Sequence, residues 1–154
     1  MTPAAIAADL HAAVDAGLEM FGHIDEPLTT KRPAEGGWCA REVLGHLVDS
    51  ACNNHRRFVI GQATAETATV FETYEQDAWV ARQRYAEVPF RDIVALWVAY
   101  NRHLAHVIAA TPEPALAHEA RFSGGNAVTL GFVMQDYVVH LRHHLDQLRS
   151  RVGA

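Results

Sequence analysis

Several features that place a chain in a common functional class are missing from these 154 residues. The two cysteines, Cys39 and Cys52, form no Cys-x-x-Cys motif and imply no disulfide framework. Apolar stretches are interrupted by His, Arg or Asp well before membrane-spanning length, so we expect no transmembrane helix and no membrane partner. Basic residues do not cluster beyond short pieces such as Arg56-Arg57, and the net charge is -5, which argues against nucleic-acid binding. Residues 1–6 lack the basic start of a secretory signal, and we expect a cytoplasmic protein.

The size and composition indicate one globular domain spanning residues 1–154. Hydrophobic residues make up 49% of the chain and charged residues 20%, which is ordinary for a globular protein with a proper core. The ten histidines are the outlier. Either some of these histidines form a functional site or most of them are exposed on the surface.

Four segments have the apolar spacing of amphipathic helices, at about residues 3–23, 38–60, 90–110 and 129–149. Thr2 and Pro3 are suited to begin the first helix as N-cap and first-turn residue. Cys39 and Glu42 stand where a capping box would begin the second, although cysteine is a poor substitute for Ser or Thr.

A long polar connection, residues 61–89, joins the second and third predicted helices, and residues 76–85 within it could form a short helix. Residues 123–126 have the composition of a turn. Only residues 118–122 show a weak strand alternation, and we expect no sheet. These segments predict an all-α fold, a four-helix bundle with a long crossover between helices 2 and 3.

A histidine pair in the last predicted helix is the strongest chemical signal. His140 and His144 are four residues apart, so they lie on one helix face, one turn apart. Two such imidazoles can bind one divalent metal ion, and a third from another helix, with His46 as the candidate, would leave coordination positions open for chemistry. Spacing alone leaves the alternative open that the pair arises by chance among ten histidines.

Other histidine pairs could chelate as well. His140 with His143 and His103 with His106 are spaced by three residues. We rank both lower, because an adjacent arginine turns His103 and His143 toward solvent.

A polar stripe follows His46 along the second predicted helix and consists of Asp49, Ser50, Asn53 and Arg57. A polar stripe that faces a bundle interior marks a site more often than a packing solution. The alternative is a solvated face with a local contact between Asp49 and Asn53.

Residues 38–47, with the sequence WCAREVLGHL, resemble the W-S-x-x-E-x-L-x-H-L signature of the DinB-like family, and residues 136–148 resemble its C-terminal H-x-x-x-H helix. Residues 74–79 and 96–104 are similar to one DinB-like subgroup, and the resemblance spans nearly the whole chain in order. Cys39 departs from the pattern, where the family often has Ser or Thr. The resemblance implies a four-helix bundle that binds a zinc- or nickel-type divalent ion, with His46, His140 and His144 as ligands.

The resemblance implies several possible activities. Some relatives are S-transferases or isomerases that use a low-molecular-weight thiol such as bacillithiol or mycothiol, and many have no assigned activity. A thiol-dependent S-transferase acting on a small molecule is therefore the first expectation. The alternatives are a metal-dependent hydrolase and a non-catalytic bundle that binds a metal or a small ligand; relatives are often dimers, and we expect a homodimer. Asp49, Asn53 and Arg57 are the candidates to orient a cofactor or a substrate carboxylate.

Two further roles are expected around this site. Asp136, four residues before His140, could accept the hydrogen bond that the second nitrogen of a metal-bound histidine usually donates, or it could complement the helix dipole. Tyr74, Asp77 and Trp79 in the crossover could close over the site as a lid, although core packing is the favoured role of Trp79.

Overall fold

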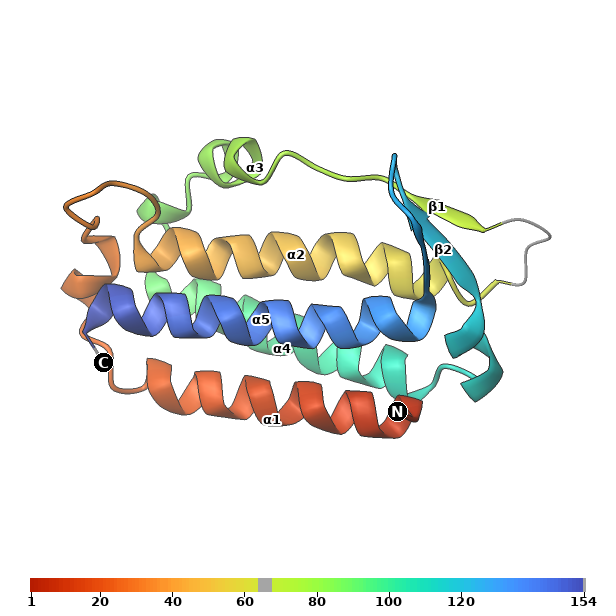
Figure 1. Cartoon of the computed structure of the whole chain (residues 1–154). Helices are drawn as coiled ribbons and strands as arrows, with labels where there is room; N and C mark the ends of the chain where they lie inside the picture. The colour runs from red at the N-terminus through yellow and green to blue at the C-terminus, as the bar shows by residue number, and fades with distance from the viewer. Residues whose placement is uncertain (64–67, 154) are drawn as a thin grey trace.

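Four long helices form the body of the protein in the computed structural model, which describes residues 1–63 and 68–153 (Figure 1). They are α1 (Pro3–Phe21), α2 (Ala40–Ile60), α4 (Phe90–Ala109) and α5 (Leu130–Val152). The predicted four-helix bundle is confirmed, and each long helix begins and ends within a few residues of its expected bounds.

Local capping residues set several of these helix ends. The Thr2 Oγ1 atom accepts a hydrogen bond from the Ala5 amide at 3.2 Å, and Thr129 Oγ1 accepts one from the Phe132 amide at 3.2 Å. At the start of α2 the Cys39 amide donates to the Glu42 carboxylate at 3.0 Å, so the Glu half of the predicted capping box forms.

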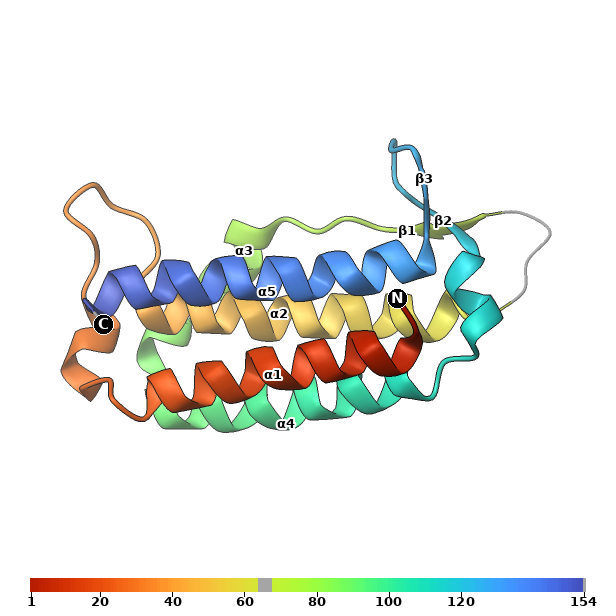
Figure 2. The same ribbon diagram turned by 60° about the horizontal axis from the view of Figure 1, so that its bottom comes forward.

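The order of the helices in space explains the long crossover. Helix α1 packs against α4 and α5, and α2 packs against the same two helices, so α1 and α2 are not neighbours. Figures 1 and 2 show that α2 and α4 run in the same direction, opposite to α1 and α5. Parallel neighbours cannot be joined by a short turn, and the chain after α2 therefore returns along the outside of the bundle before α4 begins.

The crossover contains β1 (Thr69–Phe71), the short helix α3 (Gln76–Gln83) and the 3₁₀-helix η2 (Tyr85–Glu87). Helix α3 confirms the short helix expected within residues 76–85 and ends two residues earlier than predicted. The remaining 3₁₀-helices are η1 (Glu26–Thr30) and η3 (Glu113–Ala117).

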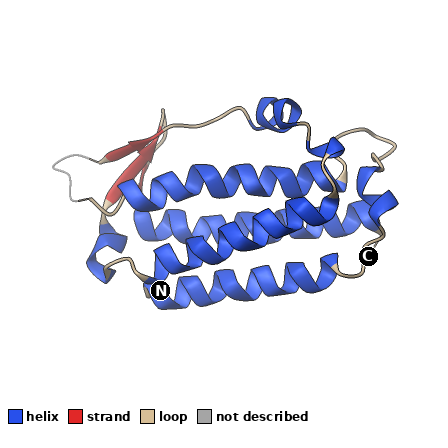
Figure 3. Ribbon diagram, turned by 180° about the vertical axis from the view of Figure 1, so that it is seen from behind, coloured by secondary structure: helices blue, strands red, loops and turns tan. Residues whose placement is uncertain are grey.

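The expectation of no sheet was wrong, because a small sheet closes one end of the bundle (Figure 3). Strand β1 pairs in parallel with β2 (Glu119–Phe122), which pairs antiparallel with β3 (Ala127–Thr129) across the predicted turn. The weak alternation at residues 118–122 was thus a real strand. Its parallel partner lies in the crossover, about fifty residues earlier in the chain, where no local pattern could reveal it.

Helix α2 places several polar side chains in the interior of the bundle. Its buried residues include His46, Asp49, Ser50 and Asn54 among the apolar side chains of the core. Buried polar groups are costly unless they find partners, so a polar section of a core indicates a functional site. Within residues 1–63 and 68–153, no helix combines the length and apolarity that crossing a membrane requires.

Candidate metal centre

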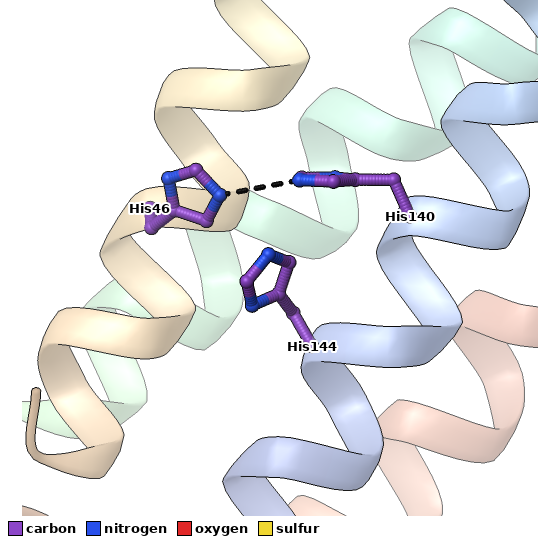
Figure 4. Close-up of side chains that lie close together, drawn as sticks. All are labelled: His46, His140 and His144. Atoms are coloured by element: carbon purple, nitrogen blue, oxygen red, sulfur yellow. Dashed lines mark hydrogen bonds between the residues drawn. The ribbon is translucent and has the colours of Figure 1, made fainter. Parts of the chain in front are cut away.

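Three histidines from two helices converge between α2 and α5 (Figure 4). His46 comes from α2, and His140 and His144 come from α5, one helical turn apart. Each offers a ring nitrogen, and the three atoms all lie within 4.8 Å of one another. The structure therefore brings together the three residues that the spacing and the family resemblance pointed to.

The spacing between the ring nitrogens of His46 and His140 fits a tetrahedral metal ion. The Nε2 atoms of His46 and His140 are 3.3 Å apart. Two imidazole nitrogens bound to zinc at about 2.0–2.1 Å, at a tetrahedral angle, lie about 3.3–3.4 Å from each other. Three imidazoles suit zinc, nickel, copper and iron alike, so the geometry supports a divalent cation without selecting one.

Hydrogen bonds orient the two histidines of α5. The Nδ1 atom of His144 lies 2.7 Å from Oε1 of Gln147, and the Nδ1 atom of His140 lies 3.5 Å from Oγ of Ser50. A protonated Nδ1 that donates outward leaves Nε2 free to face a cation. Neither partner was assigned this role from the sequence. Ser50 lies one turn after His46 on α2, so its place in the polar stripe was the available signal.

Packing orients His46 instead. The Trp38 ring lies against it, with 5.0 Å between ring centroids. The Nδ1 atom of His46 is buried and has no hydrogen-bond partner in the described part of the chain. The orientation of this ring therefore depends on its apolar neighbours.

All three imidazoles are poised in their neutral form. Burial, reinforced by the neighbouring imidazoles, lowers the pKa of His46 to about 3 and that of His140 to about 4. Burial also lowers the pKa of His144, although the hydrogen bond to Gln147 opposes this shift. Neutral imidazole is the form that binds metal ions, so the site needs no deprotonation near neutral pH to accept a cation.

A cavity of about 320 Å³ has His140 in its wall and so adjoins one of the three histidines. Helices α2 and α5, the crossover and β2 all contribute to its lining. The other lining residues are Ser50, Asn54, Arg57, Thr73, Tyr74, Gln76, Phe122, Val133, Asp136 and Tyr137. The cavity is large enough for a small molecule and combines polar with aromatic side chains.

The first role weighed for Asp136 was wrong, and the second is not met either, because Asp136 is the seventh residue of α5 and lies beyond its first turn. Ser50, and not Asp136, contacts the Nδ1 atom of His140. Asp136 is exposed in the wall of the cavity, one turn before His140 on α5. Ser50 approaches the His140 ring from the facing helix α2.

Asp49 faces away from the cavity. Its carboxylate accepts hydrogen bonds from the Tyr85 hydroxyl at 2.7 Å and from the Gln83 side-chain amide, and Asp49 is only 1% exposed. Burial raises the pKa of this carboxyl to about 6, against the lowering effect of the two hydrogen bonds. Asp49 thus joins α2 to the crossover and lines neither of the cavities described here.

The other two candidates in the polar stripe, Asn53 and Arg57, have different surroundings from each other. The Asn53 side chain donates to the main-chain oxygen of Asp49 at 2.9 Å, a local contact of the kind weighed as the alternative. It borders a second cavity of about 440 Å³ on the other side of residues 72–75. Arg57 lines both cavities.

Tyr74 lies in the wall of both cavities, as a lid residue would, and contacts the Trp79 ring with 5.1 Å between ring centroids. Trp79 is half-buried and borders the second cavity, so the expectation that it packs in the core was wrong. Asp77 is exposed and lines neither cavity.

The predicted exposure of His103 and His143 in the other histidine pairs is confirmed. His143 is exposed on α5, and His103 and His106 are exposed on α4 with 6.4 Å between their ring centroids. Among residues 1–63 and 68–153, the cluster of His46, His140 and His144 is the one group of three or more His, Cys, Asp or Glu side chains with ligand atoms this close.

Two bacterial proteins are similar to this chain in sequence. A protein of Halalkalibacterium halodurans, named "Putative metal-dependent hydrolase", is 25% identical over 127 residues, which are 82% of this chain and 72% of the relative. A protein of Oceanobacillus iheyensis with the same name is 24% identical over 115 residues, 75% of this chain and 65% of the relative.

The solved structure of YfiT from Bacillus subtilis, described as "a probable metal-dependent hydrolase with an unusual four-helix bundle topology", aligns with a TM-score of 0.77. The alignment covers 98% of this chain and 86% of that chain at 21% identity, so it supports the fold. The family model of the DinB superfamily matches residues 9–148, about nine-tenths of the chain. This chain belongs to the DinB superfamily.

Proposed function

We propose that the protein is a metal-dependent hydrolase that acts on a small molecule in the 320 Å³ cavity. The observation that carries this proposal is the convergence of three imidazole nitrogens within 4.8 Å, with His140 also forming part of the cavity wall. Three protein ligands leave coordination positions open, which is typical of catalytic rather than structural metal sites. The names of the two similar bacterial proteins favour hydrolysis over the thiol-dependent transfer that the sequence first suggested.

In this proposal the protein side chains hold the cation, and the cation provides Lewis-acid catalysis. His46, His140 and His144 would hold a divalent ion, which acts as a Lewis acid and makes water a better nucleophile near neutral pH. Ser50 and Gln147 keep the rings of α5 turned toward the ion.

Asp136 is the proton acceptor in this proposal. It is the one carboxylate in the lining of the cavity within the described residues, and it lies one turn before His140 on the same helix. An exposed carboxylate beside the attacking water can accept its proton and pass it to the leaving group. Tyr74 and Phe122 form the aromatic part of the wall.

The test is hydrolysis of a panel of small esters, amides and lactones by metal-loaded protein purified without a histidine tag. We expect activity that chelator abolishes and added metal restores. His46→Ala should lose both the metal and the activity, whereas Asp136→Asn should keep the metal and lose about 100-fold or more in rate. Asp146→Asn is the matched control, because it removes a carboxylate from the outer surface of the same helix.

Two outcomes would contradict the proposal. One is full metal content in His46→Ala, which would exclude a three-histidine site. The other is a metal-loaded protein that transfers a low-molecular-weight thiol to an electrophile and hydrolyses nothing in the panel, which would favour the S-transferase.

A further inference from the structure

Arg57 lies in the cavity wall and forms no ion pair with the residues that the structure describes. Within residues 1–63 and 68–153, no carboxylate lies within ion-pair distance of its guanidinium group. Its hydrogen-bond acceptors are both neutral: Nη1 donates to Asn54 Oδ1 at 3.3 Å and Nη2 donates to the Glu72 carbonyl oxygen at 3.0 Å. The Phe122 ring packs against it, with its centroid 4.8 Å from Cζ.

This environment leaves most of the binding capacity of the guanidinium unused. Arginine has five N–H donors in a planar fork, and two atoms account for the contacts above. The side chain is half-buried, and burial lowers the pKa of Arg57. A cation that is partly removed from water and has no counter-ion is costly, and a ligand that brings a negative group offsets that cost.

The charged side chains of the cavity wall, considered apart from an ion at the three histidines, favour a monoanion. Its lining contains one guanidinium, from Arg57, and one carboxylate, from Asp136, and these two groups are not paired. A dianion such as phosphate would be repelled by Asp136 more strongly than a singly charged carboxylate, whose two oxygens match the guanidinium fork.

We infer that the cavity binds a carboxylate group of its ligand through Arg57. If the proposed hydrolase function is correct, the scissile bond lies toward His140, and the substrate is a small carboxylic acid with an ester or amide bond at a distance from the carboxylate. Arg57 follows Ser50, the neighbour of His140, by seven residues on α2, which corresponds to about 10 Å along the helix axis. Val133 and Phe122 line the cavity and provide an apolar surface for the part of the ligand in between.

Binding of simple probes tests the inference independently of any reaction. The dissociation constants of hexanoate, hexanamide and inorganic phosphate are measured by titration calorimetry on the metal-loaded full chain. Hexanamide has nearly the shape of hexanoate without its charge, so we expect it to bind at least about 10-fold more weakly, and phosphate to bind more weakly than hexanoate.

Substitutions then assign the effect to one side chain. Arg57→Gln should weaken hexanoate binding by about 10- to 100-fold and leave hexanamide binding unchanged. Arg57→Lys keeps the charge without the fork and should lie between Arg57→Gln and the unaltered chain. Arg56→Gln is the matched control, because it removes the same charge from the neighbouring residue, which is exposed and does not line this cavity; it should change the affinity less than twofold.

Equal binding of hexanoate and hexanamide, or unchanged hexanoate affinity in Arg57→Gln, would overturn the inference. Tighter, Arg57-dependent binding of phosphate would overturn the assignment to a carboxylate. If circular dichroism shows that Arg57→Gln does not fold, the hexanoate affinity of Arg57→Lys decides.

The His46→Ala variant separates the two proposals. It should lose metal and hydrolysis but keep Arg57-dependent hexanoate binding. Arg57-dependent hexanoate binding by a chain that hydrolyses nothing would contradict only the proposed function.

Discussion

The Nε2 atom of His46 lies 3.3 Å from the Nε2 atom of His140, although 94 positions separate the two residues in the chain. Without a cation, one of these nitrogens must carry a proton and donate it to the other. A divalent ion held by both rings would take the place of that shared proton. The interaction between these two rings would therefore differ between the metal-free and the metal-loaded protein.

Removal of any one of the three imidazoles should abolish stoichiometric metal binding. We expect His46→Ala, His140→Ala and His144→Ala each to bind zinc or nickel at least about 100-fold more weakly, because each variant keeps only two of the three protein ligands. Elemental analysis of protein purified without a histidine tag measures the number of metal ions bound per chain. The matched control is His143→Ala, an exposed histidine on the same helix, which should retain the metal.

The hydrogen bond from His144 to Gln147 should contribute to metal affinity without touching the ion. Loss of such an orienting partner typically weakens metal binding about 10- to 100-fold, and we expect this of Gln147→Ala in a chelator competition assay. Gln135→Ala is the control, because its side chain bonds only to the Gly131 carbonyl of its own helix. Equal affinities of the two variants would show that packing alone orients His144.

Acid should destabilise the metal-free protein through the buried histidines. The folded-state pKa values of His46 and His140, about 3 and about 4, lie below the ordinary value near 6.5. The unfolded chain therefore binds more protons below about pH 6.5, and the stability is lost progressively as the pH falls toward the folded-state values. Urea denaturation should give an unfolding free energy lower by on the order of 2 kcal/mol at pH 5 than at pH 7.5.

The comparison for that experiment is between two substitutions on α5. His140→Gln should flatten the pH dependence, since glutamine does not titrate, whereas His143→Gln should leave it unchanged. An identical pH dependence in the His140→Gln variant and the unaltered chain would contradict the assignment to the buried ring.

The effect of Asp49 on the pH dependence of stability should be opposite to that of the buried histidines. Its folded-state pKa of about 6 is raised by burial above the ordinary value of 3.8, so the folded state binds the additional proton between these values. This contribution to stability is complete below about pH 4 and is lost as the pH rises through about 6. Asp49→Asn should therefore gain stability relative to the unaltered chain by on the order of 1 kcal/mol from pH 4.5 to pH 8, measured by urea denaturation. A gain that is the same at both pH values would show that Asp49 does not titrate in this range.

Gly45 should not tolerate a larger side chain. A Cβ atom at this position would overlap three carbons of the Tyr85 ring, the same ring whose hydroxyl bonds to Asp49. We expect Gly45→Ala to lose about 1–3 kcal/mol of unfolding free energy, despite the higher helix propensity of alanine.

Gly22→Ala is the control for this substitution, because a Cβ there would meet its nearest atom at 3.4 Å, an ordinary contact. The combination of Gly45→Ala with Tyr85→Ala should recover part of the loss beyond additivity, since the obstructing ring is gone. Additive losses in this double-mutant cycle would place the strain elsewhere.

The helices were predictable because their signals are local. Thr2 and Thr129 cap the helices that follow them, and the apolar spacing of each segment depends on residues within a few turns. The sheet was missed because β1 and β2 are each only three or four residues long and come together only when the crossover passes over the end of the bundle.

The sequence by itself determined the helical segments and the placement of His140 and His144 on one helix face, because the helix repeat alone fixes that relationship. Only the tertiary structure decided that His46 meets them within 4.8 Å, that Ser50 contacts His140, and that Asp49 turns to Tyr85 while Arg57 has no ionic partner among the described residues. These outcomes depend on how α2, α5 and the crossover pack. Ser50, Asp49 and Arg57 belong to one polar stripe on α2 but contact the metal site, the crossover and the cavity, respectively, because successive helix positions face different neighbours.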